Sequence, residues 1–272
     1  MVATASTGST RSAECPPSSE GGLSGGSDSS RDRRRNRAWC RHRRHLHGAG
    51  ADVVVIGRRV EPLERLCAGL GDRARAEVCD IADAACVDNL AHRLADEQVS
   101  ILINNAGIPG PVAPLYEIEP ADWDEVFATN VRGSYLMCRA FLPGMIDRRD
   151  GDIVNLASVS GKRPLARRTP YCASKIAVIG LTSTLAFEVG PYGIRVNSLS
   201  PGPIEGERMS RNFRLEAERT STTVEEARAA FVDHSALGRM VTEDEVGQAV
   251  LAMLAMPGMS GADIDLSAGM VA

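Results

Sequence analysis

A short apolar run, Val99-Ser100-Ile101-Leu102-Ile103, ends in the polar and small residues Asn104-Asn105-Ala106-Gly107. A run of this length that is bounded by turn-forming residues is typical of a strand. Past Gly50, similar runs alternate with segments that have helical character, and this alternation favours a parallel sheet with helices on both faces. The sequence therefore predicts the α/β class, with a single doubly wound sheet.

The alternation also predicts where the elements lie. We expect strands at residues 53–57, 76–80, 100–103, 152–156, 194–199 and 262–266, and helices at 61–70, 82–96, 121–145, 171–189 and 243–254. Pro120 suits the first turn of the helix at 121–145. Ligands in such folds bind outside the carboxyl ends of the strands. Asn105, Ser158 and Ile204 fall at such ends, so we expect the site there.

Tyr171 and Lys175 stand four residues apart in the predicted helix at 171–189. With 3.6 residues per turn they share one helix face, so the ammonium can lie beside the phenol. Free tyrosine titrates near ~10, and an adjacent positive charge favours the phenolate. This makes Tyr171 a candidate general acid/base, although any amphipathic helix can also carry such a pair by chance.

Further motifs surround this pair. Ser158 lies thirteen residues before Tyr171 and three before Gly161, Asn130 lies in Ala128-Thr129-Asn130-Val131, and Arg195-Val196-Asn197-Ser198 leads into Pro201-Gly202-Pro203-Ile204. In order and spacing, these motifs and Asn104-Asn105-Ala106-Gly107 resemble the short-chain dehydrogenase/reductase family, including its 3-oxoacyl-acyl-carrier-protein reductases. The resemblance runs from about Gly50 to the C-terminus. It implies a Rossmann-type oxidoreductase that interconverts a ketone and a secondary alcohol by hydride transfer.

The resemblance implies a role for each of four residues. Tyr171 would exchange a proton with the substrate oxygen, and Ser158 would hydrogen-bond the same oxygen. Lys175 would lower the Tyr171 pKa and bind the nicotinamide ribose. Asn130, in an irregular helix, would anchor a water that relays protons from Lys175. Simpler structural roles are also open, because serine is common in turns after strands and asparagine can be an ordinary helix residue.

The residues after the strand at 53–57 bear on the cofactor. NAD-dependent enzymes of this fold usually place a carboxylate there, but this chain has Gly57-Arg58-Arg59. Because an arginine can bind a 2′-phosphate by a forked contact, we expect NADP(H) in preference to NAD(H). By resemblance, Asp80 and Ile81 would flank the adenine and Asn105 would line the cleft. Gly202 and Ile204 would lie on the nicotinamide side, with Tyr171 and Lys175.

The composition is that of an ordinary enzyme. The chain has 272 residues, 43% of them hydrophobic, a formal net charge of −4 and seven cysteines without paired C-x-x-C spacing. We expect reduced thiols in a cytoplasmic protein and no metal site. We expect no apolar stretch as long as the ~20 residues of a membrane span. The net charge gives no reason to expect nucleic-acid binding. The family resemblance implies a small carbonyl or alcohol substrate and a homo-oligomer, either a dimer or a tetramer.

The N-terminal segment departs from the family. Its members begin with an apolar strand and a glycine-rich loop for the cofactor pyrophosphate, whereas residues 1–47 are rich in Ser, Gly and Arg and carry no strand-like apolar run. We therefore divide the chain into an aberrant, disordered segment at 1–47 and a catalytic domain at 48–272 that has lost its first strand. The segment could be a mistranslated stretch, a basic tail that binds nucleic acid or an acidic partner, or, less well, a transit peptide.

Residues 205–236 correspond to the substrate lid of the family. Met209, Phe213 and Phe231 suggest apolar contacts there, and His234 is expected at the surface. A thioester, a sugar, a steroid or another ketone would be compatible with this lid. Because the pyrophosphate loop is missing, a second function class stays open, namely a catalytically impaired binding or regulatory protein on the same scaffold.

Overall fold

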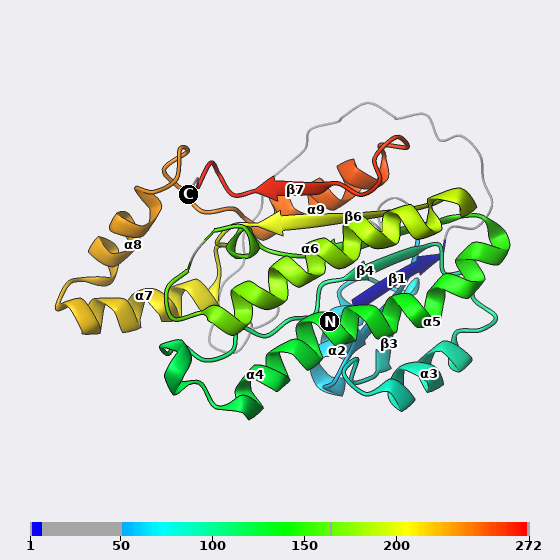
Figure 1. Cartoon of the computed structure of the whole chain (residues 1–272), viewed down its shortest axis with the longest axis horizontal. Helices are drawn as coiled ribbons and strands as arrows, with labels where there is room; N and C mark the ends of the chain where they lie inside the picture. Colours follow the sequence, from blue (N-terminus) through cyan, green and yellow to red (C-terminus); the bar gives the residue numbers. More distant parts are fainter. Residues whose placement is uncertain (1, 7–50, 164, 271–272) are drawn as a thin grey trace.

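The computed structural model describes residues 2–6, 51–163 and 165–270. Within these residues, seven strands form one sheet in the order β3-β2-β1-β4-β5-β6-β7 (Figure 1). The strands are β1 (Val2–Ser6), β2 (Asp52–Gly57), β3 (Ala74–Val78), β4 (Ile101–Asn104), β5 (Gly151–Leu156), β6 (Ile194–Pro201) and β7 (Asp263–Leu266). The neighbouring pairs β2 and β3, β4 and β5, β5 and β6, and β6 and β7 are all parallel.

Helices cover both faces of this sheet. The strand β2 shows why, because Val53 and Val55 pack into one apolar cluster while Val54 and Ile56 pack into the other. Successive side chains of a strand point to opposite faces, so a continuous apolar strand needs a cover on each side. The cover on one side comes from α3 (Ala84–Arg93), α5 (Gly133–Arg148) and α6 (Thr169–Val189), and on the other from α2 (Val60–Ala68) and α9 (Glu243–Leu254). The predicted α/β class with one doubly wound sheet is confirmed.

The first strand corrects the sequence analysis, which found no strand before residue 47. Val2–Ser6 lies between β2 and β4 and runs antiparallel to both. A run of large apolar side chains is the usual sign of a buried strand, and these residues lack one. The pairing of β1 with its neighbours is made by backbone groups, which every residue carries. The facing edges of β2 and β4 carry backbone N–H and C=O groups that need hydrogen-bond partners, and the five residues Val2–Ser6 supply them. Residues 7–50, which include the Arg-rich stretch, lie outside the described residues.

The helix predicted at 121–145 is interrupted. It consists of α4 (Pro120–Phe127), a π-helical turn (Ala128–Arg132) and α5, with Pro120 in the first turn as expected. A π-turn inserts an extra residue into the i→i−4 pattern and occurs most often at functional sites. It rotates the helix at the point where Asn130 points inward. The irregularity that the family resemblance implies at this asparagine is therefore present.

Helix α6 also corrects the sequence analysis. Thr169–Tyr192 is one helical stretch that is long and apolar enough, by length and composition, to cross a membrane. Its sequence contains Ser, Thr and a lysine among the apolar residues, which is why no such stretch was recognised. In the structure the helix packs against the sheet, with Val178, Leu185 and Val189 buried beneath it. A core helix of an α/β domain passes the same test of length and composition.

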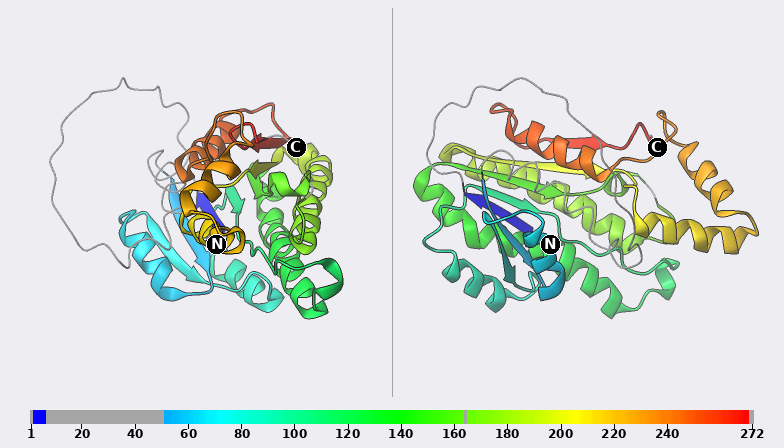
Figure 2. Two further views of the ribbon diagram at one scale, coloured as in Figure 1. Left: turned by 90° about the vertical axis from the view of Figure 1, so that its left-hand side faces the viewer. Right: turned by 180° about the vertical axis from the view of Figure 1, so that it is seen from behind.

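Two further helices extend beyond the carboxyl ends of the strands. They are α7 (Glu207–Thr220) and α8 (Val224–Val232), and both views from the front and from behind show them standing away from the sheet (Figures 1 and 2). Met209, Phe213 and Met240 are buried in a small cluster of their own, against which Phe231 and Val232 pack. Phe213 and Phe231 meet edge to face, with their ring centroids 5.4 Å apart. The aromatic residues of this region therefore fix α7 and α8 to each other.

Candidate functional site

Tyr171 and Lys175 lie on the same face of α6, as predicted. The Lys175 ammonium is 5.8 Å from the centroid of the Tyr171 ring. The Lys175 side chain is buried, and its Nζ donates a 2.7 Å hydrogen bond to the carbonyl oxygen of Leu156 at the end of β5. Burying an ammonium is costly unless it is hydrogen-bonded, so the strand end holds this cation beside the phenol.

Ser158 lies two residues after the end of β5 and is also buried. Its Oγ accepts a 3.2 Å hydrogen bond from the backbone N–H of Ser160, so it caps the short 3-10 turn at Val159–Gly161. The same Oγ lies 3.5 Å from the carbonyl oxygen of Pro201, which is long for a hydroxyl donor. Ser158 thus has a structural role as the cap of this turn. Its hydroxyl hydrogen can still turn toward a substrate oxygen.

Asn130 lies behind the cleft and not in its wall. Its Oδ1 accepts from the backbone N–H of Ile108 at 2.8 Å, and its Nδ2 donates to the Ile108 carbonyl at 3.0 Å and to Ser174 Oγ at 2.9 Å. Gly107 fits against this amide, because a Cβ at that position would stand 3.2 Å from Asn130 Oδ1 and 3.4 Å from Lys175 Nζ. Asn130 therefore ties the chain after β4 to helix α6 beside the lysine.

These groups meet in one small cleft at the carboxyl ends of β4, β5 and β6, with a volume of about 120 Å³. Of the predicted residues, it is lined by Asn105, Ser158, Tyr171, Lys175, Gly202 and Ile204. Gly202 needs to be glycine, because a Cβ there would come within 2.9 Å of Ser267. Burial raises the pKa of the thiol of Cys172, the neighbour of Tyr171, so this thiol stays protonated.

Arg58, Asp80 and Ile81 lie outside this cleft, at the ends of β2 and β3. Arg58 is exposed, and its Nη1 is 4.0 Å from Asp80 Oδ2. The other Asp80 oxygen accepts a 3.0 Å bond from the backbone N–H of Ala82, which fixes the turn. Ile81 is buried against Gly133 of α5, where a Cβ would stand 2.5 Å from it. These residues lie at the same carboxyl edge of the sheet as the cleft, as expected for the adenosine half of a dinucleotide.

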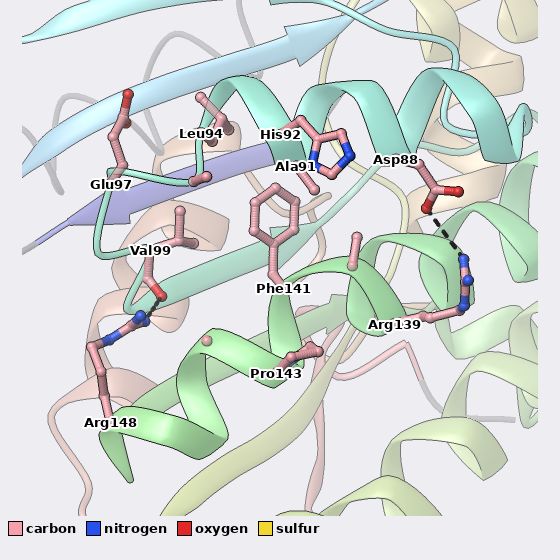
Figure 3. Close-up of a pocket in the computed structure, with 13 residues that line it drawn as sticks. Asp88, Ala91, His92, Leu94, Glu97, Val99, Arg139, Phe141, Pro143 and Arg148 are labelled. Atoms are coloured by element: carbon pink, nitrogen blue, oxygen red, sulfur yellow. Dashed lines mark hydrogen bonds and ion pairs between the residues drawn. The ribbon is translucent and has the colours of Figure 1, made fainter.

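A larger hollow of about 690 Å³ lies elsewhere, between α3 and α5 (Figure 3). Its wall includes Phe141, the ion pair of Arg139 with Asp88, and Arg148, which donates to the Val99 carbonyl (Figure 3). None of the residues predicted for the site lines it. The acid/base candidates meet in the smaller cleft.

Sequence reasoning missed two features of the cleft. Gly107 lies in the motif Asn104-Asn105-Ala106-Gly107, which by itself indicates no role for the glycine. Its role is to let the backbone pass close to Asn130 and Lys175, and only the structure shows that closeness. The acceptor for Lys175 is a backbone carbonyl, that of Leu156, and a backbone group leaves no mark in the sequence.

Comparison with known proteins gives concordant results. The model of a family described as short chain dehydrogenase matches residues 41–218. Galactitol 2-dehydrogenase of Rhizobium johnstonii is 37% identical over 233 residues, which cover 82% of this chain and 87% of that protein. A 3-oxoacyl-acyl-carrier-protein reductase of Rickettsia conorii is 30% identical over 230 residues, or 84% of this chain and 90% of that protein. D-threitol dehydrogenase of Mycolicibacterium smegmatis is 41% identical over 157 residues, but the match spans 56% of this chain and 60% of the length of that relative.

Solved structures agree in fold. A variant of actinorhodin polyketide ketoreductase with NADPH superposes with a TM-score of 0.81 at 27% identity, covering 86% of this chain and 92% of that one. An NAD⁺-bound xylitol dehydrogenase superposes with a TM-score of 0.74 at 28% identity, covering 79% and 88% of the two chains.

Proposed function

We propose that this chain, which belongs to the short-chain dehydrogenase family, is an oxidoreductase that interconverts a ketone and a secondary alcohol. The observation that carries the proposal is the meeting of Ser158, Tyr171 and Lys175 in one cleft at the carboxyl ends of the strands. A nicotinamide cofactor, when bound, supplies or accepts the hydride. The chain's own residues have to hold the substrate oxygen and move its proton.

Tyr171 is the proton donor in reduction and the proton acceptor in oxidation. Its hydroxyl shares the cleft with the Ser158 hydroxyl, so both can reach one carbonyl oxygen. Ser158 donates its hydrogen to that oxygen and stabilises the negative charge that develops there. With the oxygen fixed between two hydroxyls, the carbonyl carbon has one open direction toward the cofactor side, where Gly202 and Ile204 lie.

Lys175 serves the phenol and the cofactor together. An ammonium has three N–H donors, and one of them is directed at the Leu156 carbonyl. We propose that another reaches the ribose hydroxyls of the nicotinamide half and that the positive charge favours the phenolate of Tyr171. Asn130 holds the Gly107–Ile108 backbone against this lysine, and a proton relay through water at that position remains part of the proposal.

The nicotinamide half of the site fits such a cofactor better than the phosphate half does. Asn105, Gly202 and Ile204 line the cleft beside Tyr171 and Lys175. For the adenosine half, Arg58 lies at the end of β2, and we propose that its guanidinium binds a 2′-phosphate and so selects NADP(H). The related ketoreductase structure carries NADPH and the xylitol dehydrogenase carries NAD⁺, so both cofactors occur on this fold.

A second candidate function is favoured by the direction of β1. In an open α/β sheet the pyrophosphate sits beyond the carboxyl end of the first strand. Here Val2 pairs with Ile56 and Asn104 at the carboxyl ends of β2 and β4, and Ser6 pairs with Asp52 at the opposite edge. The carboxyl end of β1, at Ser6, therefore lies at the edge of the sheet opposite the cleft. An impaired, non-enzymatic binding or regulatory protein is the alternative that this reversal supports.

Cofactor titration of the full chain separates the two functions. We expect NADPH to bind, measured by the change in its fluorescence, and a panel of ketones to be reduced with loss of absorbance from the reduced cofactor. Binding without turnover over the whole panel, or no binding at millimolar NADPH, would favour the alternative. The Ser158→Ala variant is the control for site-specific turnover, since it removes one hydroxyl from the cleft.

We also propose a homo-oligomer built on the outer face of α6. Ile176 and Phe187 are three turns apart on this helix, and 47% and 87% of their respective surfaces are exposed. An apolar ring exposed to this degree costs free energy in water, and a second copy of the chain would cover it. A cytoplasmic location with a small carbonyl or alcohol substrate completes the proposal, in keeping with the thiols of Cys67, Cys79, Cys86, Cys138 and Cys172, which form no disulfide among the described residues.

A further inference from the structure

We propose that Lys162 is a positioning residue that fixes Ser158 in the cleft by tying the turn after it to the edge strand β7. This inference rests on the proposed function, because it assigns Lys162 an effect on the hydrogen bond that Ser158 donates. Lys162 itself does not line the cleft.

The contacts of Lys162 begin the argument. The residue ends the 3-10 turn Val159–Gly161 that Ser158 caps. Its Nζ is 2.6 Å from Asp263 Oδ2 and also pairs with Asp265, and both carboxylates stand on β7. Burial acts to lower the pKa of Lys162, but the hydrogen bonds and charges of Asp263 and Asp265 outweigh it and raise the pKa above the ordinary value. The ammonium is therefore charged throughout the assay range.

The anchor on β7 is itself held in place. Asp263 Oδ1 accepts from Ser198 Oγ at 2.6 Å and from Ser200 Oγ at 2.8 Å. Both serines are fully buried on β6, and Asp263 is largely buried. A carboxylate with its own hydrogen bonds gives Lys162 a fixed point, unlike an exposed ion pair, in which both side chains move.

The turn is confined on its other side by α6. A Cβ on Gly161 would come within 2.9 Å of the backbone of Lys175 and Ile176, so the turn touches the helix that carries the catalytic lysine. Within the turn, Gly161 N–H donates to the Ser158 carbonyl at 2.9 Å and Ser160 N–H donates to Ser158 Oγ at 3.2 Å. The turn is thus held between α6 and β7, and Lys162 supplies its side-chain contact to β7.

The test combines Lys162→Met with Ser158→Ala in a double-mutant cycle. Methionine keeps the apolar stem and removes the ammonium. We expect Lys162→Met to lower kcat by roughly 10-fold to 100-fold, the loss that a misplacement of about 1 Å produces, with the KM for NADPH unchanged. In the Ser158→Ala background, Lys162→Met should lower kcat by less than about 2-fold, because the hydroxyl that Lys162 positions is absent. Lys162→Arg should restore most of the activity.

Arg139→Met provides the matched control, since it breaks the exposed ion pair with Asp88 at 3.2 Å, on α5 and α3, and should leave kcat unchanged. Equal losses of kcat from Lys162→Met with and without the Ser158 hydroxyl would overturn the inference.

Hydrogen exchange of the Ser160 and Gly161 amides gives a readout that needs no activity. We expect faster exchange in Lys162→Met, and unchanged protection would overturn the inference even in an inactive chain. If Ser158→Ala leaves kcat unchanged while Lys162→Met speeds the exchange, the proposed function fails and the positioning of the turn stands.

Discussion

A single oxygen atom separates tyrosine from phenylalanine, and at position 171 this atom is the proposed proton carrier. We expect Tyr171→Phe to lower kcat/KM by about 10²- to 10⁴-fold, the usual contribution of a general acid/base. The fold should be unaffected, because the ring stays in place on α6. Steady-state kinetics and a thermal melt check both parts. Activity within a few-fold of the parent would contradict the role of Tyr171.

Arg58 gives a prediction about the cofactor. Its side chain is 60% exposed and is 4.0 Å from Asp80, so it contributes little to stability. We expect Arg58→Ser to raise the KM for NADPH by roughly 10-fold, since a hydrogen bond to a charged group is worth about 1.5–3 kcal/mol, and to leave the KM for NADH nearly unchanged. The comparison is Arg65→Ser, which breaks the exposed pair with Glu61. An equal effect on both cofactors would count against phosphate recognition by Arg58.

The residues that could be predicted from sequence are those whose spacing is set by one element. Tyr171 and Lys175 share a helix, and Ser158 follows a strand that the apolar pattern marks. Lys162 was not predicted, because its partner Asp263 is 101 residues away and only the pairing of β6 with β7 brings them together.

At the scale of elements, the N-terminus of α9 predicts a dependence of stability on pH. Glu245 accepts from Arg239 at 2.6 Å and from the Thr242 N–H at 2.8 Å, and these contacts lower its pKa from 4.5 to about 2. A carboxyl whose folded pKa is depressed stabilises the fold fully above its unfolded pKa. The contribution is lost as the pH falls from about 4.5 toward about 2.

We therefore expect Glu245→Gln to lower Tm at pH 7 and to converge with the parent as the pH approaches about 2. Melts by circular dichroism between these limits measure the difference. A gap that stays constant with pH would show that Glu245 acts through packing and not through its charge.

The outer face of α6 predicts the behaviour of an interface. We expect Phe187→Glu to shift the chain toward a smaller assembly, because a carboxylate would have to be buried where 87% of the phenylalanine is now exposed. Sedimentation velocity measures the shift, with Tyr116→Glu, at an equally exposed aromatic on a different element, as the comparison. A monomer before and after the change would contradict the proposed assembly.

Element types were predicted well and their interruptions were not. The apolar pattern placed a helix over residues 171–189 and a strand over 194–199, and both are present as α6 and β6. For residues 121–145 the pattern predicts a helix or a pair of helical turns, and it does not locate the π-turn at Ala128–Arg132. The flanking segments are too short for their apolar spacing to show the change of phase, so only the family resemblance implies the irregularity at Asn130.

For the whole molecule, the central position of β1 makes a prediction about stability. Thr4 lies opposite Val54 on one side and Leu102 on the other. Thr4→Pro removes a backbone donor from this central strand, and leaving a buried carbonyl without a partner costs about 1–3 kcal/mol. For a domain of this size we expect Tm to fall by roughly 2–10 °C. Thr4→Val keeps the N–H and the branched side chain, so it should melt close to the parent, and equal melts for the two variants would contradict the pairing.

The parallel sheet could be predicted from the alternation of strands and helices, but the first strand and its direction could not. Parallel and antiparallel neighbours use the same backbone groups, so nothing in Val2–Ser6 states which way it enters the gap. The proposed phosphate half of the site depends on that direction, because it decides at which edge of the sheet the carboxyl end of β1 lies. The residues of the proposed proton-transfer half, Ser158, Tyr171 and Lys175, come from α6 and from the segment after β5, and they line one cleft.

The reversed strand also makes the chain's amino end useful as a sensor. Val2 pairs with Asn104, the residue next to Asn105 of the cleft. A small environment-sensitive dye attached at position 2 would therefore lie beside the cleft. Its emission would report ligand entry in a chain whose turnover is too slow to assay.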